Sequence, residues 1–150
     1  MVEQRRHFPG DPRLISDMRD FIRNAVGQEW NEADDHQVIS QLELAVSEAA
    51  SNILLHGLQG HPGESIELIL EVAGDQVFVT FLYQGCAFTP PTVPTPDFAH
   101  CAESGYGLYL IQQSVDEVQF SRDDAGLCRI HFVKNRKQRF TGVVPNGRCD

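Results

Sequence analysis

One stretch decides the fold of this chain: Leu44-Ala45-Val46-Ser47-Glu48-Ala49-Ala50-Ser51-Asn52-Ile53-Leu54-Leu55-His56. Its polar side chains Glu48, Asn52 and His56 recur every four residues, so a helix stacks them along one stripe, a turn apart. The flanking residues are mostly apolar, and polar groups that border a core are unfavourable unless they find partners. The stretch therefore predicts a core helix with a polar seam that another part of the protein, or a ligand, must satisfy.

A strand and a first helix are predicted before this helix. Residues 3–8 form a short edge strand before Pro9, and Asp11-Pro12 is a helix start, an N-cap followed by proline. The first helix has an apolar face of residues at helical spacing, Leu14, Met18, Phe21, Ile22 and Ala25. Gly57 is the residue at which we expect the second helix to stop.

The rest of the chain predicts two hairpins separated by a loop and a helix. The strands are residues 65–72 and 77–83, joined by a tight turn at Gly74-Asp75, and residues 117–122 and 127–133. Between the hairpins lie a proline-containing loop, 85–104, and a helix, 105–115. The order β-α-α-β-β-loop-α-β-β predicts an α+β fold, a two-layer α/β sandwich. We expect a mixed, mostly antiparallel sheet with helices on one face.

Composition places the chain among soluble globular domains, with 41% hydrophobic and 22% charged residues. We see no apolar run close to the roughly 18 residues of a membrane span. The first seven residues lack the apolar stretch of a signal peptide, so we expect a cytoplasmic protein.

Charge is unevenly distributed along the chain. The net charge is −9, and Lys and Arg are absent between Asn24 and Ser121, a stretch that holds fourteen Asp or Glu. An acidic body argues against nucleic acid or an anionic membrane as the partner. Residues 135–150 form a basic C-terminal tail, which is more often a solvated end than a nucleic-acid site.

Two sites in the sequence carry chemistry. The Asn52 amide oxygen is a neutral ligand suited to Mg²⁺, and Glu48, one turn away, can accept a proton or hold a metal-bound water. A buried polar stripe capped by loop backbone explains the same helix equally well. Gly105-Tyr106-Gly107 opens a predicted helix, where backbone N–H groups and the helix dipole favour phosphate, although such a pattern alone is often only a turn.

The two motifs together resemble the GHKL ATPase superfamily, and within it the small anti-sigma-factor serine kinases of the SpoIIAB-like and RsbW-like type. Residues 48–56 match the family's N-box, Glu-x-x-x-Asn-x-x-x-His, and residues 106–111 match the helix start of its G2 box. Asp116-Glu117-Val118 follows where the family often has a similar tripeptide. The resemblance covers roughly residues 5–134, so we expect a GHKL ATPase-like domain over 1–134.

The resemblance implies a Bergerat-type fold that binds ATP and Mg²⁺. It makes Glu48 the catalytic carboxylate and Asn52 the metal ligand, and residues 87–104 become a lid over ATP. The other nucleotide-binding positions that it implies are His56, Tyr83, Gly85, Gly105, Tyr106, Gly107 and Leu108. Members bind a sigma factor, many phosphorylate a serine of a STAS-type anti-anti-sigma partner, and several are homodimers.

Two departures from the family pattern concern the nucleotide. Tyr83 stands two residues before Gly85, where the family has an aspartate that binds the adenine amino group. A lost partner for a buried polar group typically costs about 1–3 kcal/mol. The position between the G2 glycines, often near an arginine in the family, is Tyr106. Arg122 and Arg129 are the nearest later cations in the sequence.

Three functions remain open at this point. The first is an anti-sigma regulatory factor that binds Mg-ATP and phosphorylates a protein serine. The second is a non-catalytic protein-binding module of the same fold with a degenerate nucleotide pocket. The third is the catalytic domain of a two-component phosphorelay acting in trans, although the chain shows no dimerisation segment with a phospho-acceptor histidine.

Overall fold

The computed structural model describes residues 2–31, 33–58, 64–85 and 103–136. Within these residues, five strands and three α-helices follow in the predicted order: β1 Val2–Pro9, α1 Ile15–Glu29, α2 His36–Asn52, β2 Ser65–Ala73, β3 Gln76–Gln84, α3 Glu103–Ser114, β4 Glu117–Arg122 and β5 Leu127–Asn135. A 3-10 turn, Pro12–Leu14, precedes α1, and a π-helical turn, Ile53–Gly57, extends α2. The predicted lid, residues 87–104, lies almost wholly outside the described residues.

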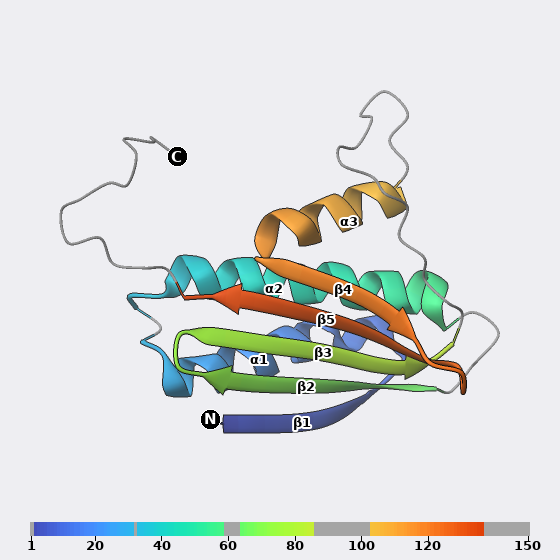
Figure 1. The fold of residues 1–150 in the computed structure, drawn as a ribbon, viewed down its shortest axis with the longest axis horizontal. Helices are drawn as coiled ribbons and strands as arrows, with labels where there is room; N and C mark the ends of the chain where they lie inside the picture. The colour runs from blue at the N-terminus through green and yellow to red at the C-terminus, as the bar shows by residue number, and fades with distance from the viewer. Residues whose placement is uncertain (1, 32, 59–63, 86–102, 137–150) are drawn as a thin grey trace.

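The strands form one sheet in the order β1-β2-β3-β5-β4, and every neighbouring pair is antiparallel. Helices α1 and α2 lie behind the sheet in Figure 1, and α3 lies beside α2 near the β4 edge. The expectation of a two-layer sandwich with helices on one face is confirmed. The sheet is antiparallel throughout rather than mixed. The two hairpins supply the pairs β2–β3 and β4–β5, and the pairs β1–β2 and β3–β5 also run antiparallel.

Strict alternation along the strands separates the two faces of the sheet. The side chains that face the helices are buried: Ile66, Leu68, Leu70 and Val72 on β2, Val77, Val79, Phe81 and Tyr83 on β3, and Cys128, Ile130 and Phe132 on β5. Phe81 and Phe132 meet edge to face, with ring centroids 5.8 Å apart. Such aromatic pairs add to the stabilisation from apolar burial.

The predicted helix and turn signals act where expected. The Asp11 side chain accepts a hydrogen bond from the backbone N–H of Arg13 at 2.9 Å and so caps the turn that begins at Pro12. Gly74 has φ 61° in the β2–β3 turn, and Gly126 has φ 87° in the β4–β5 turn. Both conformations suit a residue without a Cβ atom.

Helix α2 is the central helix of the protein. The stretch His36–Leu55 is long and apolar enough to cross a membrane, with a mean hydropathy of 1.2. The expectation that no such run exists was therefore wrong. However, 56% of that window is buried inside the protein, as in a core helix, and Glu43 and Glu48 interrupt its apolar surface.

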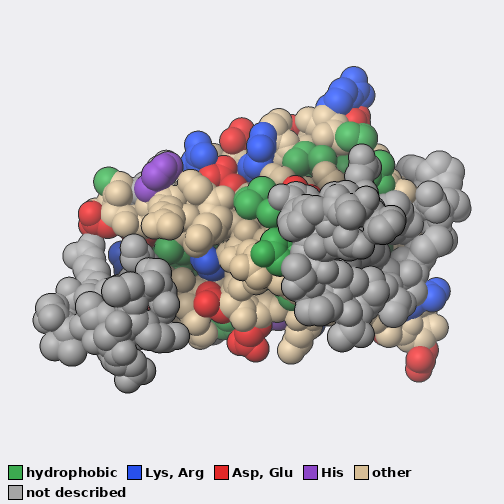
Figure 2. All heavy atoms as spheres, turned by 90° about the horizontal axis from the view of Figure 1, so that it is seen from above, with side chains coloured by type: hydrophobic (Ala, Val, Ile, Leu, Met, Phe, Trp, Pro, Cys, Tyr) green, Lys and Arg blue, Asp and Glu red, His purple; other side chains and the backbone are tan. Residues whose placement is uncertain are grey.

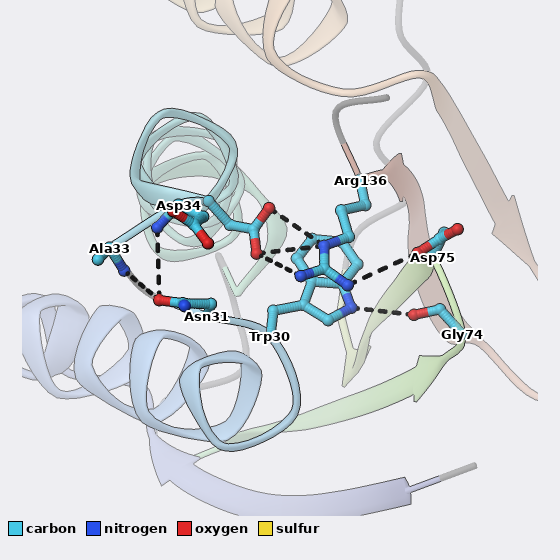
Figure 3. Close-up of polar contacts among 8 residues, drawn as sticks. Trp30, Asn31, Ala33, Asp34, Gly74, Asp75 and Arg136 are labelled. Carbon is cyan, nitrogen blue, oxygen red and sulfur yellow. Dashed lines mark hydrogen bonds and ion pairs between the residues drawn. The ribbon is translucent and has the colours of Figure 1, made fainter. Parts of the chain in front are cut away.

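Arg136 joins the end of β5 to the segment between α1 and α2 and to the β2–β3 turn. Its guanidinium contacts the Asp35 carboxylate before α2 and lies over the Trp30 ring, 5.4 Å from the ring centroid (Figure 3). Its backbone N–H donates to the Asp75 carbonyl at 2.7 Å, and the Trp30 indole donates to the Gly74 carbonyl at 3.0 Å. Arg136 lies in the range 135–150 that the sequence assigns to the tail, yet its side chain is part of the folded domain.

Candidate functional site

Glu48 and Asn52 lie on the side of α2 that faces α3. Their spacing of four residues puts them one above the other on the helix. A Cβ atom added to Gly107 of α3 would lie 3.2 Å from Glu48 Oε2 and 3.6 Å from both polar atoms of the Asn52 amide. The structure therefore brings together Glu48, Asn52 and Gly107, three of the residues that the sequence analysis proposed for one site.

Asn52 has an unsatisfied polar atom in this seam. The residue is 6% exposed, and its amide Nδ2 has no hydrogen-bond partner in the described part of the chain. Leaving a buried donor unpaired typically costs about 1–3 kcal/mol. A half-turn of the amide exchanges its nitrogen and oxygen, so the same position can present a donor or a metal-binding oxygen.

Glu48 is half-buried between the two helices. Burial raises the pKa of its carboxyl above the ordinary value, since desolvation disfavours the charged form. A carboxylate with a raised pKa is a stronger proton acceptor at neutral pH than an exposed one. Glu48 thus has the environment that a general base requires.

Helix α3 begins at Glu103, two residues before the expected start. In a helix that begins there, the backbone N–H groups before the fourth helical residue have no acceptor within the helix, and they include that of Gly105. Gly107 follows this free turn and is buried against α2, so its missing side chain allows close helix contact. Gly105 thus offers a free backbone donor, whereas Gly107 is a residue of helix contact.

The remaining predicted residues are placed less completely. His56 lies in the π-helical turn Ile53–Gly57, and its side chain, like those of Tyr106 and Leu108, is outside the described set. Gly85 follows β3, and its carbonyl lies 3.7 Å from the Cys128 sulfur, which donates to it. The nucleotide-binding roles of these positions stay predictions.

Tyr83 belongs to the hydrophobic core of the sheet. It is 2% exposed, faces the helices, and pairs with Ile66 on β2 and Cys128 on β5. A buried phenol in this position offers a different surface from the carboxylate expected for adenine recognition. The Tyr83 side chain is therefore part of the packed interior, at the end of β3.

Basic side chains do not gather near Glu48 among the described residues. Arg129 lies on the opposite face of the sheet, where it lines a shallow groove with Thr80 and His131. Figure 2 views the molecule from above relative to Figure 1. On the described part of that face, Lys and Arg are separate spots between acidic and apolar side chains and form no continuous basic patch. Phosphate recognition by this site would depend on backbone N–H groups and a metal ion.

Sequence reasoning missed Lys134, a buried cation between α2 and α3. Its Nζ donates to Gln41 Oε1 at 2.8 Å and to the Ser114 carbonyl at 2.7 Å. A signal was present, because the inward-facing series Cys128, Ile130 and Phe132 continues to residue 134.

Comparisons with known proteins identify the family of this chain. The model of the histidine kinase-like ATPase domain family matches residues 8–130. The chain is 31% identical to the serine-protein kinase RsbW of Bacillus pumilus over 144 residues, which cover 87% of this chain and 85% of the relative. It is 25% identical to the RsbW of Bacillus mycoides over 111 residues, 69% of this chain and 65% of that relative's length.

Proposed function

Because this chain belongs to the histidine kinase-like ATPase domain family, within the group of GHKL anti-sigma factors, we propose that it is an anti-sigma serine-protein kinase. In this proposal it binds Mg-ATP and a sigma factor, and it phosphorylates a serine of a STAS-type anti-anti-sigma partner. The Bacillus relatives are themselves named serine-protein kinases.

The observation that carries the proposal is the contact of Glu48 and Asn52 with Gly107 across the α2–α3 interface. It joins a half-buried carboxylate, a buried amide with an unpartnered atom, and the glycine that follows the free first turn of α3. These features fit a metal ion and phosphate, because an amide oxygen suits Mg²⁺ and free helical N–H groups suit an anion.

Each residue has a role in the proposed reaction. ATP with Mg²⁺, when bound, supplies the phosphoryl group and balances its negative charge. Asn52 would hold the metal through its amide oxygen, and the N–H group of Gly105 would bind a phosphate oxygen. Glu48 would orient the partner's serine hydroxyl and accept its proton. Gly107 keeps α3 close enough to α2 for these groups to act together.

A second function is favoured by one observation, the burial of Tyr83 in the core at the end of β3. The phenol replaces the carboxylate that would recognise adenine. A domain of this kind would bind its protein partner without using ATP.

Calorimetry separates the two functions. We expect the wild-type protein to release or absorb heat with Mg-ATP at millimolar concentration, and Asn52→Ala to abolish that signal. Gln37→Ala, at an exposed position of the same helix, is the matched control and keeps the signal. No heat from a folded wild-type protein would exclude the ATP-binding proposal and support the binding module.

The kinase step has its own test. Incubation with Mg-ATP and a STAS-domain protein should add phosphate to a serine of that protein, as detected by mass spectrometry. Glu48→Gln should remove this product while Mg-ATP heat remains. Phosphate found on a histidine of the partner instead would point to a phosphorelay.

A further inference from the structure

Helices α2 and α3 touch at two points that are equally spaced on both helices. At one point Gly107 of α3 meets Glu48 of α2. At the other, the Ser114 carbonyl of α3 and the Gln41 side chain of α2 share one ammonium group. Gln41 precedes Glu48 by the same seven residues that separate Gly107 from Ser114, two turns or about 10 Å of helix. The two helices are therefore antiparallel and in register over this length.

The shared ammonium belongs to Lys134, which enters the interface from β5. The residue is 8% exposed, and its Nζ lies 2.7 Å from the Ser114 oxygen and 2.8 Å from Gln41 Oε1. Ser114 is the last residue of α3, where carbonyl groups lack helical partners and the helix dipole favours a cation. Lys134 is thus bonded to both helices from a third element of the fold.

Neighbouring contacts attach the same end of α3 to β5. The Asp116 N–H donates to the Val133 carbonyl at 2.9 Å, and the Asp116 carboxylate accepts from the Asn135 N–H at 2.6 Å. Burial lowers the pKa of Lys134, while the nearby Asp116 acts in the opposite direction. The C-terminal end of α3 is therefore held by strand contacts, whereas its glycine-containing half rests on α2.

We propose that Lys134 is a positioning residue that sets the register of α3 against α2 and so holds Gly107 on Glu48 and Asn52. A slip of one turn would bring Ile111 to the place of Gly107. The space there is tight for such a side chain, since a Cβ atom alone would lie 3.2 Å from Glu48 Oε2 and would displace it. An apolar residue at position 134 could fill the interface but could not bond to both helices. The consequence for nucleotide binding rests on the proposed function, while the register itself does not.

Hydrogen exchange of the full chain without nucleotide tests the register. Lys134→Met removes the ammonium, and Val133→Ala is the matched control, because it destabilises the same strand from the opposite face. We expect the amides of residues 107–114 to exchange at least about tenfold faster in Lys134→Met than in Val133→Ala. The amides of β2 should exchange at the same rate in both variants. Equal exchange of α3 in the two variants would overturn the proposal. Should Lys134→Met fail to fold, Gln41→Leu breaks only the α2 half of the bridge and serves for the same comparison.

Titration with Mg-ATP tests the consequence for the site. A merely destabilised protein loses binding-competent molecules but keeps its Kd, whereas misplacement of Gly107 raises the Kd. We expect a Kd about tenfold higher for Lys134→Met and within about twofold of wild type for Val133→Ala. An unchanged Kd for Lys134→Met would contradict its positioning role. Wild-type protein that binds no Mg-ATP would defeat the proposed function, and the exchange comparison would still decide the role of Lys134.

Discussion

Arg136 binds the carboxylate of Asp35, which lies 101 positions earlier in the chain, with Nη2 at 3.0 Å and Nε at 3.1 Å from its oxygens. Asp35 is 5% exposed and precedes α2, but its side chain does not cap that helix. The guanidinium satisfies the carboxylate instead and covers the Trp30 ring. This pair ties the end of β5 to the segment between α1 and α2.

Replacement of Arg136 should therefore destabilise the fold. We expect Arg136→Met to lower the free energy of unfolding by about 2 kcal/mol, because it leaves a buried carboxylate without its charged partner. Urea denaturation measures this change. Arg13→Met is the control, since Arg13 pairs with Asp11 while 89% exposed, and its loss should lower the free energy of unfolding less than the loss of Arg136. Equal losses in the two variants would contradict the importance of the Asp35 pair.

Asn52 should be dispensable for folding. Its Nδ2 has no partner among the described residues, so Asn52→Leu removes an unsatisfied polar atom and should keep or raise the urea midpoint. The same substitution should abolish Mg-ATP binding, measured by calorimetry. Asn31→Leu provides the contrast, because the Asn31 Oδ1 accepts a hydrogen bond from the Ala33 N–H at 3.0 Å. This substitution should lower the free energy of unfolding by about 1 kcal/mol. A larger loss for Asn52→Leu than for Asn31→Leu would show that its amide is satisfied.

Glu48 should reduce stability at neutral pH. Burial raises the pKa of its carboxyl in the folded protein, so its stabilising contribution is present below the unfolded value of 4.5 and is lost as pH rises through the folded pKa. Glu48→Gln should therefore unfold at a higher urea concentration than wild type at pH 7, with the difference shrinking towards pH 4. Glu29→Gln, at an exposed site, controls for the removal of one negative charge. A difference that grows on acidification would reverse the assigned sign.

Gly107→Ala should separate stability from function. Alanine in a helix is favoured over glycine by up to about 1 kcal/mol, but here its Cβ would press on Glu48 Oε2 at 3.2 Å. We expect a smaller gain in unfolding free energy than for Gly27→Ala in α1, together with a lower rate of serine phosphorylation. Denaturation and a phosphorylation assay measure the two effects. An unchanged rate would mean that Glu48 tolerates the displacement.

His131 should make the fold sensitive to mild acid. Its Nδ1 lies 2.8 Å from Thr80 Oγ1, and its ring stacks on Phe78. Burial lowers its pKa below 6.5, Arg129 adds to this, and Glu117 and Glu71 oppose it. The unfolded chain then takes up a proton more readily, so stability falls as pH drops from 6.5 through the folded pKa. Urea midpoints from pH 7.5 to 5 should fall more for wild type than for His131→Gln, and parallel curves would contradict this.

Local pattern predicted the parts of the fold whose cause is local. The alternation in β2 and β3, the turn at Gly74-Asp75 and the start at Asp11-Pro12 each depend on a few adjacent residues. The seam of Glu48 and Asn52 was visible for the same reason, because helical spacing alone puts them on one side.

The parts that escaped prediction depend on contacts between distant segments. Nothing near Arg136 in the sequence indicates Asp35, and the buried position of Lys134 exists only because three elements meet there. The close contact of Gly107 with Glu48 is also a property of two packed helices. Their register was not encoded in either helix alone.

Among the described residues, the sheet order leaves β1 and β4 as the edge strands, and the sequence of β1 protects it from edge-to-edge aggregation. A full antiparallel pairing of β1 with β1 of a second molecule would place Arg5 opposite Arg6, twice over, in the centre of the new ladder. Like charges facing each other across a strand pair are destabilising. Pro9 at the end of β1 also lacks an N–H to donate. Charge repulsion along the exposed edge thus disfavours pairing with an identical strand, the neighbour whose backbone would otherwise fit it best.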